Sequence, residues 1–253
     1  MLVAAIQFRP TFKDIPSNLQ RLVKLVAQTA TKGAKIITLP ELTTTGYSFM
    51  NQDDAEPFAE IVNDFNPQKV TASSMSVFHL LAKRYDTHIV WGLIEKDNGT
   101  KKLYNAQVLM CPDGSFEVMR KINFFGNDFL WATEGRANPP IRKIRVEGKT
   151  YKVGLLICRD VRDKKDDKWK DFYEEGDANV VCLSTNWGRG GFPAIAWMDF
   201  VKENKTALIV ANRYGEEFNN DFGHGGVAII TAESKVYCES LVWGQDCVVY
   251  GEL

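Results

Sequence analysis

Three reactive side chains lie just past the ends of predicted strands. Glu41 follows a short apolar run, Lys121 closes a predicted strand, and Cys158 follows the unbroken apolar run of residues 153–157. An apolar run without polar alternation is typical of a strand buried on both faces. In open α/β sheets, ligands bind beyond the carboxyl ends of such strands. The positions of the three residues therefore favour a reactive site.

Together these side chains can perform covalent catalysis on a carbonyl group. A thiolate needs a nearby cation to lower its pKa from about 8.5, and Lys121 can supply that charge. Glu41 can take the thiol proton as a general base and return it to a leaving amine. Taken singly, each residue also has a structural explanation, since a cysteine after an apolar run is usually a small core residue. The set of three favours chemistry.

Composition indicates a single α/β domain spanning residues 1–253. The chain is 45% hydrophobic and 25% charged, and its net charge is −1, which suits one large core. No long basic block is present, so nucleic acid and anionic membranes are not expected partners. The N-terminal apolar run is too short for a signal peptide or a membrane span, so a soluble, cytoplasmic protein is expected.

Cysteine and histidine spacing argues against a disulfide framework, a metal centre and a Ser-His-Asp hydrolase. The cysteines are odd in number and lack a C-x-x-C pair, and the histidines lack ligand spacing. These residues are Cys111, Cys158, Cys182, Cys238 and Cys247, with His79, His88 and His224. We therefore expect neither a metal nor an organic cofactor.

The hydrophobic pattern predicts two packed mixed sheets with helices outside. Near the N-terminus, a strand, an amphipathic helix capped by Ser17 and a second strand follow each other in under forty residues, which is typical of a βαβ unit. Predicted helices cover residues 17–32, 72–85, 169–175 and 194–205. Predicted strands cover residues 2–8, 35–39, 88–94, 103–110, 116–121, 141–146, 151–157, 179–184, 207–211, 227–231, 236–243 and 247–252.

The order of several short motifs resembles the nitrilase superfamily of carbon–nitrogen hydrolases. These motifs extend over essentially the whole chain: Leu39–Leu42 (LPEL), Thr45–Tyr47 (TGY), Arg120–Ile122 (RKI), Cys158–Arg162 (CRDVR), Ser184–Trp187 (STNW), Glu203–Asn204, Val210–Arg213 (VANR) and Gly223–Ile230 (GHGGVAII). Within the superfamily, residues 121–128 (KINFFGND) look most similar to the omega-amidase-like branch.

The resemblance implies a four-layer α-β-β-α sandwich and a homodimer or higher homo-oligomer. It also implies that Cys158 attacks a carboxamide carbon and that Glu41 is the general base. Lys121 and the main-chain N–H of Arg159 would stabilise the tetrahedral intermediate. The implied reaction releases ammonia, passes through a thioester and needs no metal or organic cofactor.

The chain also departs from the family pattern. Asp128 stands where the family often has a second glutamate, so it either positions Lys121 and substrate or is an exposed loop acid. Arg159 replaces a common aromatic residue, and a charged run begins at Asp163. Arg159 and Arg162 could clamp a substrate carboxylate, although a structural ion pair explains Arg162 equally well.

Tyr47, Asn186, Trp187 and His224 are further pocket candidates. Core packing explains Trp187 at least as well, and His224 could be an ordinary loop histidine.

The leading functional hypothesis is a cysteine-dependent amidase acting on a small linear carboxamide. Hydrolysis of an N-carbamoyl amine and hydrolysis of a nitrile would use the same three residues. A catalytically silent scaffold protein is the alternative from another class, but a scaffold has no need of all three side chains together.

Overall fold

The computed structural model describes residues 1–136, 139–162, 178–188, 192–223, 225–239 and 244–253. The charged run that begins at Asp163, the predicted helix at residues 169–175 and the pocket candidate His224 lie outside the described residues. Among the helices of the described part, none is long and apolar enough to cross a membrane.

Two six-stranded mixed sheets form the centre of the molecule. The first has the order β14 (Cys247–Glu252), β1 (Leu2–Gln7), β2 (Ile36–Thr38), β3 (His88–Lys96), β4 (Leu103–Met110) and β5 (Phe116–Arg120). The second has the order β13 (Val236–Glu239), β12 (Ala228–Ile230), β9 (Ala207–Asn212), β8 (Val180–Thr185), β7 (Lys149–Ile157) and β6 (Ile141–Val146).

Each sheet has a parallel centre and antiparallel edges. Strands β1, β2 and β3 run parallel, as do β7, β8 and β9, whereas the outer pairs are antiparallel. The parallel strands are almost fully buried, which explains their continuous apolar sequences. Glu41 and Cys158 follow the carboxyl ends of the parallel strands β2 and β7, whereas Lys121 follows the antiparallel edge strand β5.

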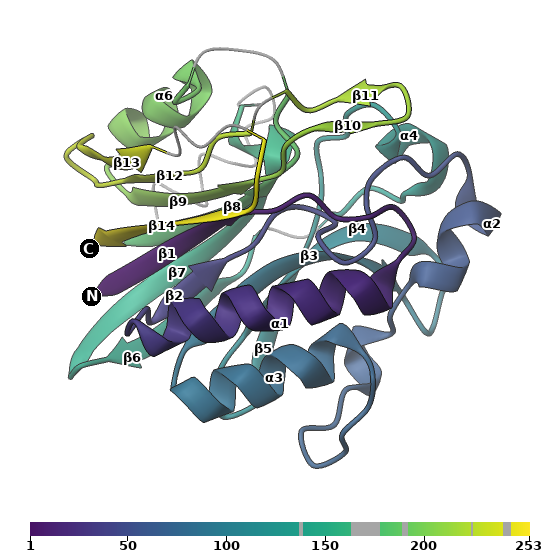
Figure 1. The fold of residues 1–253 in the computed structure, drawn as a ribbon, viewed down its shortest axis with the longest axis horizontal. Coiled ribbons are helices and arrows are strands. Elements are labelled where there is room, and N and C mark those ends of the chain that lie inside the picture. The colour runs from purple at the N-terminus through teal and green to yellow at the C-terminus, as the bar shows by residue number, and fades with distance from the viewer. Residues whose placement is uncertain (137–138, 163–177, 189–191, 224, 240–243) are drawn as a thin grey trace.

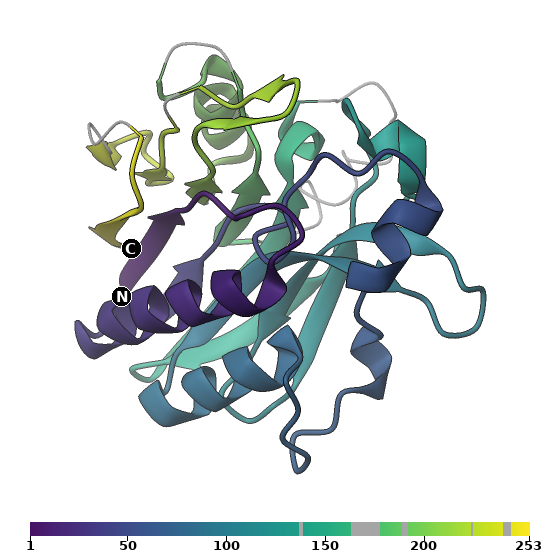
Figure 2. The same cartoon turned by 45° about the vertical axis from the view of Figure 1, so that its right-hand side comes forward.

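Helices cover the outer faces of the two sheets, as Figures 1 and 2 show. Helices α1 (Ile15–Thr31) and α3 (Ser74–Tyr85) pack on the first sheet through one apolar cluster. Helix α6 (Ile195–Asn204) lies on the second sheet, where Trp197, Phe200 and Val201 are buried. This arrangement confirms the predicted sandwich of two mixed sheets with helices outside.

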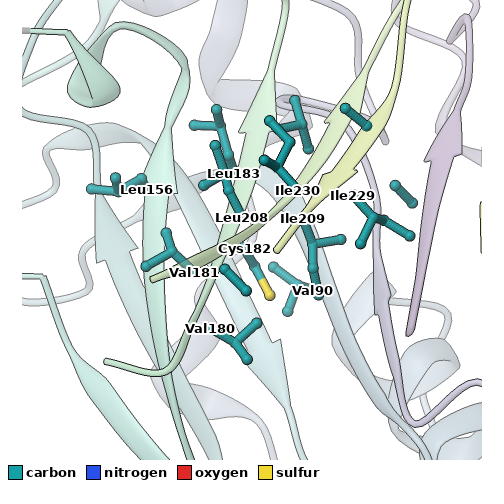
Figure 3. Packing of buried hydrophobic residues seen from close by; sticks show 14 of the residues in the cluster. Val90, Leu156, Val180, Val181, Cys182, Leu183, Leu208, Ile209, Ile229 and Ile230 are labelled. Carbon is teal, nitrogen blue, oxygen red and sulfur yellow. The ribbon is translucent and has the colours of Figure 1, made fainter. Parts of the chain in front are cut away.

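The largest apolar cluster includes the layer between the sheets. Val90 of β3 lies there beside Cys182 and Ile209 of the second sheet (Figure 3). Polar contacts also join the sheets within this layer. Gln107 Nε2 donates to Ser184 Oγ at 2.8 Å, and Ser184 Oγ donates to the Leu39 carbonyl at 2.7 Å. Because buried polar groups must be paired, these bonds favour one relative position of the sheets.

Local turn chemistry accounts for the elements that the sequence analysis misplaced. Helix α1 begins before Ser17, because the Asp14 side chain accepts from the Ser17 main-chain N–H and Pro16 lies in the first turn. The prediction of Ser17 as the cap is therefore wrong. Short elements without an apolar period were also missed; they are α4 (Asp128–Trp131), β10 (Glu216–Glu217) and β11 (Asn220–Asp221). A single helical turn, α2 (Gln52–Ala55), lies in the acidic segment of residues 51–68, where one turn was expected.

Gly92 of β3 lets the chain around Glu41 lie directly against the first sheet. A Cβ atom at residue 92 would stand 2.3 Å from the Leu42 nitrogen and 2.7 Å from the Glu41 Cα atom. Gly92 also donates its N–H to the Pro40 carbonyl and accepts from the Thr43 N–H. The position of Glu41 therefore requires a residue without a side chain at position 92.

We predict that Gly92→Ala lowers the free energy of unfolding by about 2 kcal/mol or more, because the new methyl group clashes with main-chain atoms that cannot rotate away. The Gly99→Ala variant is the matched control, since a Cβ atom there meets its nearest neighbour at 3.5 Å. Urea denaturation of both variants measures the difference. Equal stability of the two variants would contradict this account of Gly92.

Candidate active site

Glu41 is held in a buried turn directly after β2. It is 1% exposed. Its Oε1 atom accepts from Lys121 Nζ at 2.6 Å and from Asn105 Nδ2 at 2.7 Å, and its Oε2 atom accepts from the Asn186 N–H at 2.9 Å. Every one of these partners is a donor, which is the arrangement that an ionised carboxylate requires.

Lys121 lies at the end of β5 and is shared by two carboxylates. Its Nζ atom donates to Glu41 Oε1 and to Asp128 Oδ2, each at 2.6 Å, and the side chain is 1% exposed. Burial alone would lower the pKa of Lys121, but the negative charges of Asp128 and Glu41 outweigh burial and raise that pKa well above its ordinary value. Lys121 is thus an ammonium ion at neutral pH.

Asp128 is fully buried behind Lys121, so it is not an exposed loop acid. Its Oδ2 atom also accepts from the Phe125 N–H at 3.0 Å, and its Oδ1 atom accepts from Asn105 Nδ2 at 2.9 Å. Asn105 therefore joins both carboxylates through a single amide nitrogen. The geometry makes Asp128 a positioning group for Lys121, whereas direct contact with substrate stays a prediction.

Cys158 begins a short 3-10 turn (Cys158–Val161) that follows β7. Its φ angle is +47°, in the left-handed region that non-glycine residues rarely adopt. Asp160, in the same turn, accepts from the N–H groups of Asn123 at 2.7 Å and Ile122 at 3.3 Å. One buried carboxylate thereby ties the cysteine turn to the segment that follows Lys121.

The Cys158 thiol is protonated at neutral pH. Burial, reinforced by the charge of Glu41, raises its pKa to about 12, and Lys121 opposes this shift only in part. Lys121 thus lowers the pKa of the thiol, as expected, but burial is the largest effect and outweighs it. Burial also raises the pKa of Glu41, although Lys121 acts in the opposite direction.

A cavity of about 670 Å³ opens next to Cys158. The predicted pocket residues Tyr47, Arg159, Arg162, Asn186 and Trp187 line it together with Cys158. Glu41, Lys121 and Asp128 lie deeper, with almost no exposed surface. The β10–β11 hairpin (Figure 1) supplies a further wall of the cavity, made of residues 219–222.

The two arginines after the cysteine differ in their contacts. The Arg162 guanidinium stacks 4.1 Å from the centre of the Trp187 ring. Arg159 Nη1 donates to the Phe124 carbonyl at 3.3 Å. Both side chains still line the cavity, so the prediction that they face the pocket is consistent with the geometry. On the opposite wall, the Tyr47 hydroxyl donates to the Phe125 carbonyl.

Sequence reasoning missed three residues that hold this site together. Asn105 lies in the buried strand β4, where its amide and that of Gln107 interrupt the apolar residues. A buried amide is an informative signal because it must be paired. Asp160 was seen only as part of a motif. Glu217 accepts from the N–H groups of Tyr47 and Ser48, each at 2.8 Å, and pairs with the buried Arg213 at 3.0 Å. No local pattern reveals such long-range pairing.

Among the described residues, no group of three or more His, Cys, Asp or Glu side chains could hold a metal ion. The buried carboxylates of Glu41 and Asp128 are occupied instead by Lys121 and Asn105.

Several characterised proteins resemble this chain over much of its length. A protein N-terminal amidase from Schizosaccharomyces pombe is 26% identical over 297 residues, covering 100% of this chain and 99% of the relative. A nitrilase from Pyrococcus abyssi is 28% identical, covering 85% of this chain and 76% of the relative. An omega-amidase from Xenopus tropicalis is 32% identical, covering 57% of this chain and 50% of the relative.

Solved structures confirm the fold. The crystal structure of an amidase from Nesterenkonia sp. has a TM-score of 0.78 to this chain at 20% sequence identity, covering 100% of this chain and 90% of that chain. A variant of that amidase carries the acetamide moiety of fluoroacetamide at its active-site cysteine.

A family model describes the chain almost from end to end. The model for carbon–nitrogen hydrolases matches residues 2–252, which agrees with the two-sheet fold and with the family resemblance of the ordered motifs. The chain belongs to the carbon–nitrogen hydrolase family, within the nitrilase superfamily.

Proposed function

We propose that the protein is a cysteine-dependent amidase that converts a small linear carboxamide to an acid and ammonia through a thioester. One observation carries this proposal. Lys121 is bonded to both Glu41 and Asp128, and the Cys158 thiol beside them faces a cavity large enough for a small molecule. The relatives that are named amidases support the same class of reaction.

In the first half-reaction, the Cys158 sulfur attacks the carboxamide carbon while Glu41 takes the thiol proton. Because the thiol is protonated at rest, attack requires this proton transfer. Glu41 Oε2 accepts from one donor, the Asn186 N–H, whereas Oε1 accepts from two. Oε2 is therefore the atom with room for the proton. The same proton then moves to the leaving nitrogen, the carbon–nitrogen bond breaks and ammonia departs.

The negative charge that develops on the carbonyl oxygen needs fixed donors. We assign this role to the Lys121 ammonium and to the main-chain N–H of Arg159, which follows the nucleophile. In the second half-reaction, Glu41 takes a proton from water, the resulting hydroxide attacks the thioester, and the sulfur leaves with that proton. No step in this sequence requires an external oxidant, reductant or cofactor.

Arg159 and Arg162 favour an amide that carries a carboxylate at its far end, because both guanidinium groups border the cavity next to Cys158. An N-carbamoyl amine with a carboxylate would satisfy the same geometry and is the second candidate. Its hydrolysis would release carbon dioxide as well as ammonia.

An ammonia-release screen tests the proposed function. The panel contains glutamine-like ω-amides, aliphatic amides, carbamoyl amines and nitriles, with Cys158→Ala as the matched control. We expect at least one ω-amide to release ammonia, and we expect the alanine variant to lower its turnover by about 10⁴-fold or more, because the nucleophile is lost. Equal rates for the parent and the variant would show that Cys158 is not the nucleophile.

The Asp128→Asn variant tests how Lys121 is positioned. Loss of the charge leaves the ammonium ion with a single carboxylate partner, so Lys121 shifts toward Glu41 and away from the oxyanion. We expect kcat to fall by about 100-fold, which is typical for the loss of one oxyanion donor, while the urea midpoint changes little. Asp113→Asn is the control, since Asp113 lies in a surface turn. A kcat unchanged from the parent would refute this role of Asp128.

The pH dependence follows from the raised pKa values of Glu41 and Cys158. Glu41 acts as a base only when it is deprotonated. As the pH decreases, kcat/KM should therefore begin to fall at a pH above 4.5, the ordinary pKa of a glutamate side chain. A thiolate absorbs in the far ultraviolet, so the absorbance of the parent minus that of Cys158→Ser measures ionised Cys158. Near neutral pH, this difference should be absent. A thiolate signal there would mean that a pre-formed ion pair, and not general-base catalysis, activates Cys158.

A further inference from the structure

The side chain of Asn186 is the strongest unexplained polar group at the proposed site. Asn186 follows β8, directly across the sheet from the cysteine turn, because Ile157 of β7 pairs with Ser184 of β8. Its main-chain N–H donates to Glu41 Oε2 at 2.9 Å and also favours the ionised form of Cys158. The backbone of Asn186 therefore lies between the proposed base and the proposed nucleophile.

The amide group of that side chain has no partner in the described structure. Asn186 is 6% exposed and lines the 670 Å³ cavity, yet neither Oδ1 nor Nδ2 makes a hydrogen bond within the described residues. Leaving both ends of a buried amide unpaired is unfavourable. The neighbouring amide of Asn105 also has an unpaired Oδ1 atom, but its Nδ2 atom is bonded to both carboxylates, whereas Asn186 has both ends unpaired. The unpaired amide of Asn186 is best explained as a group that pairs with a ligand.

We propose that Asn186 Oδ1 accepts a hydrogen bond from the terminal NH₂ group of the substrate and thereby selects primary amides over esters and nitriles. This inference rests on the proposed amidase function. A bound carboxamide whose oxygen faces Lys121 presents its NH₂ group toward Glu41 and Asn186. Glu41 Oε2, once it carries the thiol proton, faces the nitrogen lone pair, and Asn186 Oδ1 accepts one of the two N–H groups. The leaving nitrogen is then oriented to receive the proton that Glu41 took from Cys158.

The substrate class follows from this pairing. A nitrile nitrogen carries no hydrogen, and neither does the leaving oxygen of an ester, so either group leaves Asn186 Oδ1 unpaired. Sites built to bond a substrate N–H discriminate strongly against analogues that lack it. Primary amides and terminal carbamoyl groups both carry the required NH₂ group.

The test compares one acyl group in two forms, as the primary amide and as the methyl ester. Asn186→Leu removes both polar atoms, keeps the side-chain volume and leaves the main-chain bond to Glu41 in place. We expect kcat/KM for the amide to fall by about 100-fold and kcat/KM for the ester to change by less than about threefold. If the leucine variant does not fold, Asn186→Ser carries the test, because its short hydroxyl cannot replace Oδ1.

The control variant is Asn98→Ala, which removes an exposed asparagine from the turn between β3 and β4 and should leave the ratio of amide to ester rates unchanged. Equal losses on amide and ester in the Asn186 variants, or no loss on the amide, would overturn the inference. The Cys158→Ala variant separates the two proposals. If it abolishes both activities while the Asn186 variants keep the parental ratio, the amidase function stands and the role of Asn186 fails.

Discussion

The buried ammonium group of Lys121, shared between Glu41 and Asp128, is the interaction on which the rest of the site depends. Charges buried to this degree are tolerated only when they are paired and fully hydrogen-bonded. Here one positive charge meets two carboxylates at 2.6 Å each, and Asn105 donates to both of them. All three groups are buried, and both carboxylates are bonded to Lys121.

Burial, more than charge, decides the chemistry available to Cys158. Lys121 favours the thiolate, but burial and the charge of Glu41 outweigh it and keep the thiol protonated. The thiol then reacts only when a substrate is present and Glu41 can take its proton. A protonated resting thiol is also a poor target for adventitious alkylation and oxidation, because the thiolate is the reactive form.

The site is assembled across two sheets, so its precision depends on how the sheets pack. Glu41 and Lys121 follow strands of the first sheet, whereas Cys158 and Asn186 follow strands of the second. The polar bridge from Gln107 through Ser184 to the Leu39 carbonyl ends two residues before Glu41 in the chain. Its middle member, Ser184, lies two residues before Asn186. Asp160 makes a second cross-connection, from the cysteine turn to the segment after Lys121.

Much of this architecture was predictable because buried parallel strands have continuous apolar sequences and their ends carry the polar residues. Glu41 and Cys158 were found in this way, whereas Lys121 was found at the end of a hairpin strand, β5. The raised thiol pKa was not predicted, because it comes mainly from burial, which depends on the packing of the whole fold. The roles of Asn105 and Glu217 were also missed, because their partners lie far away in the chain. Asp14 was missed although its bond to Ser17 is local.

Formation of an acyl group on Cys158 is the central claim, and rapid-quench mass spectrometry during turnover of an amide tests it most directly. The account predicts that the peptide containing Cys158 gains the mass of the acyl group as ammonia is released, and that added hydroxylamine diverts this acyl group to a hydroxamate. Steady release of ammonia with neither an acylated Cys158 peptide nor a hydroxamate would contradict a thioester mechanism.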